Sequence, residues 1–209
     1  MHGCDIKVLA INGSARKGGN TSILLRYVLK ELETEGIATE LVELSGTQLH
    51  GCLSCRKCAS RRDGMCAQAG DLGNALIRKM AVADGILFGS PTYVSDLSPE
   101  IKALMDRACM VAKANDGMFR HKLGAAVVSV RRAGAIHTFD SLNNFFLINE
   151  MIIPGSSYWN IGFGREIGDV EQDEEGIATM RTLGKNMAWL LQTLKSPMAM
   201  PELAEIVSQ

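Results

Sequence analysis

The stretch that decides the fold is Lys7-Val-Leu-Ala-Ile-Asn-Gly-Ser-Ala-Arg-Lys-Gly-Gly-Asn-Thr-Ser22. It begins with a short apolar run and passes through a glycine-rich turn. Beyond the turn, apolar residues recur at a spacing of four: Leu24, Val28 and Leu32. The change from a continuous apolar run to a spacing of four predicts a buried strand that leads into a helix, from about Thr21 to Glu35.

The same alternation of strand and helix patterns continues along the chain. We expect further strands at 39–44, 85–90, 123–130 and 151–153, and helices at 71–83, 98–112, 136–149 and 174–194. Strands that alternate with helices favour a parallel sheet, because right-handed crossovers place helices on both of its faces. The predicted fold class is therefore α/β, with five parallel strands.

Composition is that of an ordinary folded domain. Of the 209 residues, 46% are hydrophobic and 22% are charged. The 22 Lys and Arg against 23 Asp and Glu give a net charge of -1, which argues against nucleic-acid or anionic membrane partners. No apolar stretch reaches the roughly 18 residues of a membrane span. We expect one cytoplasmic domain at 1–195, with a cysteine-rich insertion at 45–70 and a tail at 196–209.

The turn after the first strand has the composition of a phosphate site. Asn12–Ser22 offers hydroxyls, an amide, the Arg16 guanidinium and the start of a helix, all of which suit a phosphate. It resembles a P-loop, but Gly19-Asn20 stands where Lys-Ser/Thr is required, and it contains no G-x-G-x-x-G run. A phosphate monoester therefore fits better than a triphosphate or a dinucleotide.

Two further strand ends carry unusual loops. Ser90–Pro99 is rigid, rich in hydroxyls and contains an aromatic ring, as the edge and face of a planar heterocycle require. Arg131–His137 supplies cationic donors and a glycine. In open parallel sheets, ligands bind beyond the carboxyl ends of the strands where the strand order reverses. The three loops meet there if the order is 2-1-3-4-5.

At this point the chain resembles a known family. NGSARKGGNTS, SPTYVSDLSPEIKALMDR and YWNIGFGREIGDVEQDEEG look like the flavodoxin-like NAD(P)H-dependent FMN reductases. The cysteine pattern is similar to that of their iron-sulfur flavoprotein branch, and the resemblance covers residues 7–194. It implies a flavodoxin-like fold and an oxidoreductase that binds FMN. No dedicated nicotinamide site is visible.

The resemblance also implies which residues contact the flavin. The phosphate would be held by Ser14, Arg16, Asn20 and Thr21. Pro91, Thr92, Tyr93 and Val94 would line the isoalloxazine ring, with Arg131 and Gly134 close by. We add Ser22, the last hydroxyl of the first loop, to these cofactor-binding residues, and we assign no catalytic side chain.

Four cysteines lie in the insertion at the spacing C-x2-C-x2-C-x7-C: Cys52, Cys55, Cys58 and Cys66. Three cysteines at C-x2-C-x2-C bind one cluster in bacterial ferredoxins. Structural zinc more often takes two separated C-x2-C pairs or a Cys/His mixture. We predict that the four hold a [4Fe-4S] cluster. Zinc, free thiols and a regulatory disulfide stay open as alternatives.

The insertion is also basic. Arg56, Lys57, Arg61 and Arg62 are opposed within it only by Asp63. Positive charge lowers the pKa of nearby thiols and offsets an anionic cluster. The alternative is that these side chains form an ordinary solvated surface.

The leading functional hypothesis joins the two sites. A flavin accepts two electrons or one, whereas a cluster carries one, so together they convert between the two kinds of chemistry. We expect electrons to pass between a ferredoxin-like or reduced-nucleotide donor and a small acceptor such as O2, peroxide or a quinone. The alternatives are an NAD(P)H-dependent FMN or quinone reductase without a cluster, and a non-enzymatic flavin redox sensor. The resemblance implies a homodimer or homotetramer in which one subunit's cluster faces its neighbour's flavin.

Overall fold

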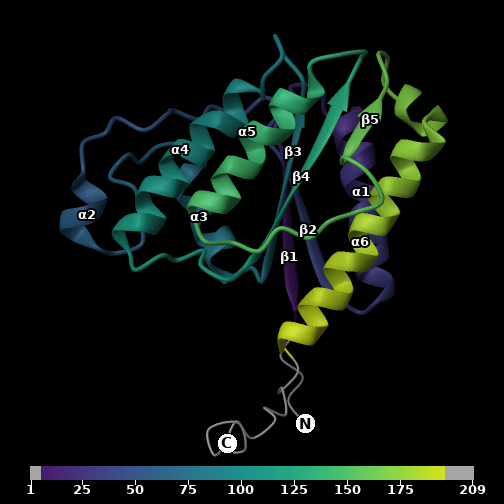
Figure 1. Ribbon diagram of the computed structural model, residues 1–209. Helices are drawn as coiled ribbons and strands as arrows, with labels where there is room; N and C mark the ends of the chain where they lie inside the picture. Colours follow the sequence, from purple (N-terminus) through teal and green to yellow (C-terminus); the bar gives the residue numbers. More distant parts are fainter. Residues whose placement is uncertain (1–5, 196–209) are drawn as a thin grey trace, which may run out of the picture.

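The computed structural model describes residues 6–195, so the predicted tail lies outside the described residues. It contains one five-stranded parallel sheet in the order β2-β1-β3-β4-β5, as the sequence predicted (Figure 1). The strands are β1 (Lys7–Asn12), β2 (Ala38–Glu43), β3 (Gly85–Pro91), β4 (Leu123–Val130) and β5 (Ile161–Phe163). All eight residues of β4 are buried, which explains their continuous apolar pattern.

Helices cover both faces of the sheet. They are α1 (Asn20–Thr34), α2 (Lys57–Arg61), α3 (Gly73–Val82), α4 (Pro99–Ala114), α5 (Ala135–Ile148) and α6 (Glu174–Lys195), with a 3-10 turn at Asp169–Gln172. α1 and α6 pack on one face, and α3, α4 and α5 on the other (Figure 1). In the described part of the chain, no helix is long and apolar enough to cross a membrane.

The prediction of a fifth strand at 151–153 is wrong. Ile152 forms a single bridge with the amino end of β4, and Pro154, which has no amide hydrogen to donate, follows soon after. The chain leaves the sheet there and returns as β5 (Ile161–Phe163), which pairs with Val128–Val130 at the carboxyl end of β4. One sheet edge is thus shared by two short segments.

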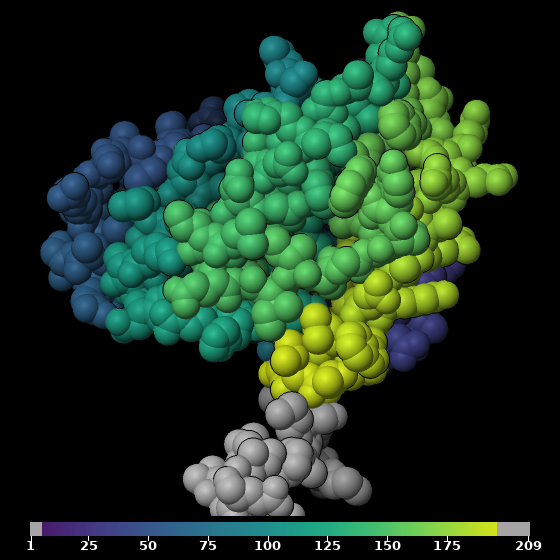
Figure 2. Space-filling model, viewed as in Figure 1, coloured from purple at the N-terminus to yellow at the C-terminus, as the bar shows by residue number. Residues whose placement is uncertain are grey.

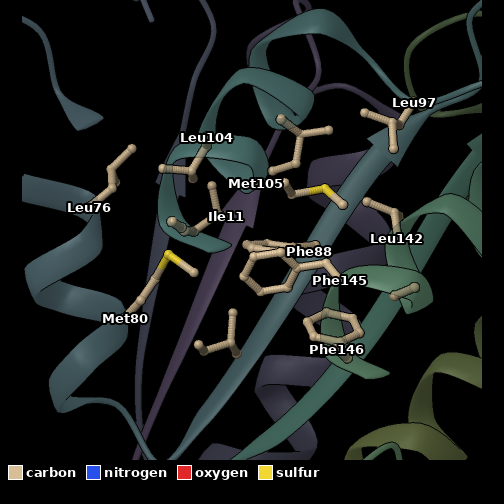
Figure 3. Packing of buried hydrophobic residues seen from close by; sticks show 14 of the residues in the cluster. Ile11, Leu76, Met80, Phe88, Leu97, Leu104, Met105, Leu142, Phe145 and Phe146 are labelled. Carbon is tan, nitrogen blue, oxygen red and sulfur yellow. The ribbon is translucent and has the colours of Figure 1, made fainter. Parts of the chain in front are cut away.

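The core beneath α5 is built around three phenylalanines (Figure 3). The ring of Phe88 on β3 lies 5.0 Å from that of Phe145 and 5.3 Å from that of Phe146, measured between centroids. A Cβ at Gly124 on β4 would lie 2.3 Å from the Phe146 ring, so glycine lets α5 approach the sheet closely. Each buried ring contributes about 2 kcal/mol by removing apolar surface from water.

The cysteine-rich insertion forms a lobe at one side of the molecule, with α2 outermost (Figures 1 and 2). Its short helix packs on α4 through Cys58, which is buried. The lobe is attached to the α4 face, away from α1 and α6.

Candidate functional site

The turn after β1 lies where the strand order reverses, because β1 stands between β2 and β3. Its backbone is tied to β3 and to the loop that follows β3. The Gly13 amide donates to the carbonyl of Gly89 at 2.8 Å, and Ser98 Oγ donates to the carbonyl of Gly13 at 2.6 Å. A Cβ at Gly13 would lie 2.7 Å from Ser98 Oγ, so this close approach requires glycine. The first two predicted loops are therefore joined.

A hollow of about 280 Å³ opens between these loops, at the carboxyl ends of the strands. It brings together most of the residues that the sequence singled out for the cofactor: Ser14, Arg16, Asn20, Thr21, Pro91, Thr92, Tyr93 and Arg131. We call this hollow the phosphate-loop pocket. Around it, the loops after β3 and β4 project from the top of the molecule (Figure 2).

The charged residues that line the phosphate-loop pocket are all positive. Three arginines line it: Arg16, Arg131 and Arg165. Among the residues that the structure describes, no carboxylate does so. A cleft lined by one sign of charge concentrates ligands of the opposite sign, so this pocket suits an anion.

Two of the predicted phosphate residues also anchor a distant segment. Arg16 Nη1 donates to the carbonyl of Arg165 at 2.9 Å. The Asn20 side chain donates to the carbonyl of Glu166 at 2.8 Å and accepts from the Gly168 amide at 2.9 Å. The nitrogen and the oxygen of the Asn20 side-chain amide are thus both hydrogen-bonded to backbone groups. Arg16, by contrast, keeps its other guanidinium donors for a ligand.

Ser22 is placed apart from the other predicted cofactor residues. It is fully buried, and its Oγ donates to the Glu43 carboxylate at 2.6 Å. The same carboxylate accepts from the Gly18 amide at 3.1 Å. Ser22 therefore joins α1 to β2 and does not line the phosphate-loop pocket.

The loop after β3 forms a tight hairpin. The backbones of Tyr93 and Asp96 exchange two hydrogen bonds, of 2.8 and 2.9 Å. Between them, Val94 and Ser95 adopt positive φ angles of 50° and 59°, which is rare for a branched residue such as valine. Val94 is fully exposed at the tip and lies outside the pocket lining. Such strain is held in place by its surroundings, and it clusters at functional sites.

Gly134 supports that hairpin from the loop after β4. A Cβ at this position would lie 2.6 Å from Ser95 Oγ, and its φ of 87° favours glycine. Gly134 lines a second hollow of about 390 Å³, together with Tyr158 and Trp159. The structure thus places Gly134 beside the hairpin and outside the phosphate-loop pocket.

Sequence reasoning missed several residues of the pocket: Ser129, Val130, Gly164 and Arg165. Ser129 is the last-but-one residue of a buried strand, and its Oγ lies 2.7 Å from Thr21 Oγ1. A single hydroxyl in an apolar strand was the available signal. Arg165 lies in the segment YWNIGFGREIGDVEQDEEG, which resembles the family, but its approach to Arg16 depends on the position of β5.

The four cysteines differ in their surroundings. Cys58 is buried, Cys55 is exposed, and Cys52 and Cys66 are intermediate. The amide of Ser54 points to the sulfur of Cys52 at 3.3 Å, and the amide of Gln68 points to that of Cys66 at 3.5 Å. Across residues 6–195, no three His, Cys, Asp or Glu side chains are grouped closely enough to hold a metal.

The backbone between the cysteines is sharply wound. Ser54, Arg56 and Arg62 have positive φ angles of 53°, 54° and 48°. Each such non-glycine residue costs about 1 kcal/mol or more. One of them, Ser54, lies between Cys52 and Cys55, and another, Arg56, lies between Cys55 and Cys58. The residues with positive φ are therefore concentrated where three cysteines would surround one metal cluster.

The cations of the insertion form ion pairs with residues both inside and outside it. Arg61 pairs with Asp63, whereas Arg62 pairs with Asp116, just beyond the end of α4. Asp63 is therefore not the only acidic partner of these cations. Among the described residues, Arg56 and Lys57 form no ion pair. Two cations thus stay available beside the cysteines.

The family model for NADPH-dependent FMN reductases matches residues 6–166, more than half of the chain. The chain belongs to this family. An iron-sulfur flavoprotein of Methanocaldococcus jannaschii is 36% identical over 197 residues, covering 91% of this chain and 100% of the relative. A second one from the same organism is 29% identical over 187 residues, covering 84% and 92%. This member of the FMN reductase family therefore belongs to the iron-sulfur flavoprotein branch and is an oxidoreductase flavoprotein.

Solved structures confirm the flavodoxin-like fold of this family member. A flavodoxin, a WrbA-like protein from Agrobacterium tumefaciens, superposes with a TM-score of 0.62. The two share 14% sequence identity, over 90% of this chain and 98% of the other. At that identity the likeness shows the fold alone.

Proposed function

We propose that this flavoprotein binds FMN with its phosphate in the phosphate-loop pocket and exchanges electrons with a [4Fe-4S] cluster held by the cysteine loop. The observation that carries the flavin half is the convergence of three loops on one carboxylate-free pocket lined by three arginines. A phosphate monoester carries the charge and the acceptor oxygens that such a set of donors recognises.

The groups facing the phosphate have distinct roles. Ser14 Oγ accepts from the Arg16 amide at 3.1 Å, which leaves its hydroxyl hydrogen free to donate. Arg16 is fixed through one guanidinium nitrogen by the Arg165 carbonyl, so its other donors are pre-oriented. Thr21 lies on the first turn of α1, whose amide dipoles add positive potential.

The wall formed by Pro91, Thr92 and Tyr93 would lie against the isoalloxazine ring. The Thr92 amide is held by the Ser129 carbonyl at 2.9 Å, and its hydroxyl accepts from Thr138 at 3.2 Å. This fixes the wall, and the Tyr93 ring, 40% exposed, can limit the access of water. When bound, FMN supplies redox chemistry in one-electron or two-electron steps.

The cysteine loop fits a cluster by the chemistry of its donors. Four thiols occur within fifteen residues, and amides already point to the sulfurs of Cys52 and Cys66. Hydrogen bonds to the sulfurs and positive charge both tune the potential of such clusters. We assign Cys52, Cys55, Cys58 and Cys66 as the ligands, and the names of the two Methanocaldococcus relatives support this assignment.

The surroundings of the loop favour an acidic protein as the electron donor. Arg56 and Lys57 are exposed beside the cysteines, and complementary charge raises association rates. A ferredoxin-like donor therefore fits, with O2, peroxide or a quinone as the acceptor. We further propose a homodimer or homotetramer, in which the lobe of one subunit approaches the flavin of another.

The flavin half is tested by comparing FMN with riboflavin, which lacks the phosphate. Wild-type protein should bind FMN at least tenfold more tightly in a fluorescence titration. Arg16→Ala should weaken FMN binding about tenfold and leave riboflavin binding unchanged, since a charge-assisted hydrogen bond contributes about 1.5 kcal/mol or more. The matched control is Lys17→Ala, which removes an exposed cation that does not line the pocket. Equal affinities for FMN and riboflavin would refute the proposal.

The second candidate is an NAD(P)H-dependent FMN or quinone reductase without a cluster. The observation in its favour is that, within residues 6–195, the cysteine sulfurs are not grouped for a metal. Rapid bleaching of the bound flavin by NADPH in iron-free protein, with no ferredoxin present, would favour it.

A further inference from the structure

Arg107 is a buried charge in the middle of the fold. It lies on α4, among apolar residues that pack on the sheet, and its side chain is 0% exposed. It is the largest fully buried side chain in the described part of the chain. A buried guanidinium is costly unless its hydrogen bonds are satisfied, so its partners indicate what the residue is for.

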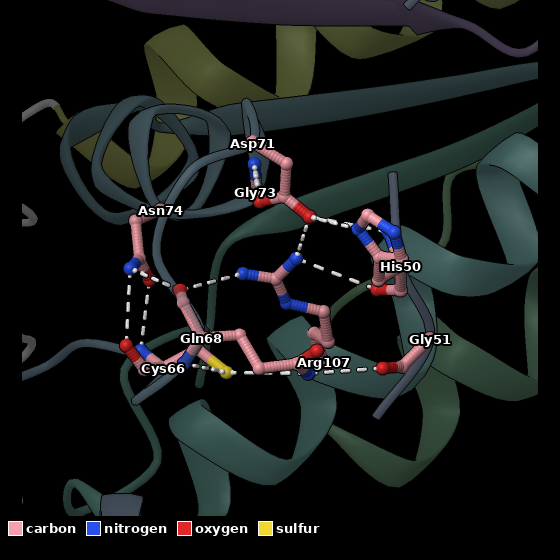
Figure 4. A network of polar contacts seen from close by, with 8 residues as sticks. All are labelled: His50, Gly51, Cys66, Gln68, Asp71, Gly73, Asn74 and Arg107. Carbon is pink, nitrogen blue, oxygen red and sulfur yellow. Dashed lines mark hydrogen bonds and ion pairs between the residues drawn. The ribbon is translucent and has the colours of Figure 1, made fainter. Parts of the chain in front are cut away.

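In the sequence, those partners lie on either side of the four cysteines, and in the structure they surround Arg107 (Figure 4). Arg107 Nη1 donates to Asp71 Oδ2 at 2.5 Å and lies 3.4 Å from the carbonyl of His50. Nη2 donates to the carbonyl of Gln68 at 3.2 Å. His50 precedes Cys52 by two residues, and Gln68 follows the last cysteine by two. The two arms of one planar fork therefore reach the two ends of the loop.

A second set of hydrogen bonds closes the same junction. Gln68 Nε2 donates to the carbonyl of Gly51 at 2.9 Å, directly across the neck of the loop (Figure 4). Asn74 holds Cys66 by two bonds, accepting from its amide at 2.8 Å and donating to its carbonyl at 3.0 Å. The Asn74 amide also donates to the Gln68 carbonyl at 3.0 Å. Arg107 and Asn74 thus share one acceptor.

The first residue of α3 makes room for this fork. A Cβ at Gly73 would lie 2.5 Å from Arg107 Cζ and 2.6 Å from both terminal nitrogens. The Gly73 amide donates to Asp71 Oδ1 at 3.0 Å, so the carboxylate is bound on both oxygens. Any side chain at position 73 would displace the guanidinium while leaving Arg107 itself in the sequence.

We propose that Arg107 is a positioning residue for the cysteine loop: its guanidinium fork ties the segment before Cys52 to the segment after Cys66. The first and last of the four thiols are thereby held at a fixed separation before any metal arrives. The statement that these thiols receive a cluster rests on the proposed function. The tie itself is a property of the metal-free protein.

The decisive variant is Arg107→Lys, studied in metal-free protein. A lysine keeps a positive charge beside Asp71, but its single nitrogen cannot donate to both Asp71 and the Gln68 carbonyl as the two terminal nitrogens of arginine do. Amide hydrogen exchange, followed by mass spectrometry, should be at least tenfold faster in peptides that contain His50 and Cys66. Exchange in β4 should stay unchanged. Arg120→Lys is the matched control, because that arginine pairs with Glu150 on the exposed surface.

Gly73→Ala gives an independent second test, because it displaces the fork without changing its charge. It should speed exchange in the same two peptides, and it decides the matter if Arg107→Lys does not fold. Wild-type exchange in both peptides of the folded variants would overturn the proposal.

Anaerobic reconstitution adds a separate readout. Iron and sulfide uptake should be at least tenfold slower in Arg107→Lys than in wild-type protein. FMN affinity should be unchanged, since the phosphate-loop pocket does not contain Arg107. If wild-type protein takes up no iron, the proposed cluster is wrong, and the exchange data alone still decide whether Arg107 ties the loop. If wild-type protein does take up iron, equally fast uptake by Arg107→Lys would overturn the proposal.

Discussion

Arg107 Nη1 and Asp71 Oδ2 lie 2.5 Å apart, with side chains that are 0% and 3% exposed. Burial raises the pKa of Asp71, but the hydrogen bonds from Arg107 and from the amides of His50 and Gly73 together lower it from 3.8 to about 2. Because the folded pKa is the lower one, the pair stabilises the fold above about pH 4. That contribution is lost as the pH falls from about 4 to 2.

This linkage predicts how acid affects the metal-free protein. The part of the unfolding free energy that depends on Asp71 should fall by about 2 kcal/mol between pH 4 and pH 2. Asp71→Asn should be less stable at pH 6 by about 3 kcal/mol, since it leaves Arg107 buried without its counter-ion. The variant should also lack this part of the acid dependence. Urea unfolding at several pH values measures both, and parallel curves for the two proteins would contradict the account.

Two cysteines of the loop should respond differently to substitution. Cys55 is exposed, so Cys55→Ser should change the stability of the metal-free protein by less than about 0.5 kcal/mol. Cys58 is buried against α4, where its sulfur donates weakly to the Met110 carbonyl at 3.7 Å. Cys58→Ser should therefore cost about 1 kcal/mol.

Iron binding should nevertheless be lost in both variants, while FMN stays bound. Cys109→Ser is the control, because Cys109 lies outside the loop and burial raises the pKa of its thiol. Loss of FMN together with iron would mean that the loop serves the fold and not a cluster. Retention of iron by Cys55→Ser would remove that residue from the ligand set.

Much of this arrangement could be predicted from the sequence. Local patterns identify β1, β3, β4 and their loops, because a buried strand followed by a glycine-rich turn and an amphipathic helix needs little tertiary context. β5 could not be found, because three residues at a sheet edge carry too short a pattern. The segment at 151–153 has a more strand-like composition, yet the chain leaves the sheet after a single bridge.

The junction at Arg107 was missed for another reason. Its partners Asp71 and Gln68 lie 36 and 39 residues away, so nothing local reveals them. The available signal was a charged residue within the apolar face of α4, where burial of an unpaired charge is prohibitive. Likewise, Ser129 reaches Thr21 only because the carboxyl end of β4 and the start of α1 lie side by side.

Packing around β3 gives a further prediction for the pocket. A Cβ at Gly89 would lie 2.6 Å from Leu25 Cδ1 and 2.9 Å from Thr21 Cγ2. Gly89→Ala should thus push the first turn of α1 away from the sheet, lowering stability by about 1 to 3 kcal/mol and weakening FMN binding. The matched control is Gly85→Ala in the same strand, where the nearest contact, Val8 Cγ2, is 3.2 Å away. Thermal unfolding and an FMN titration compare the two, and equal effects would argue against this role for Gly89.

The central claim is that one chain holds both FMN and a cluster bound by Cys52, Cys55, Cys58 and Cys66. The most direct measurement is the FMN, iron and sulfide content of anaerobically purified protein, together with its visible spectrum. The account predicts about one FMN per chain, iron and sulfide in the ratio of a [4Fe-4S] cluster, and broad absorbance at about 400 nm that exceeds the absorbance of FMN and is lost in Cys55→Ser. Protein that carries FMN but neither iron nor sulfide would contradict it.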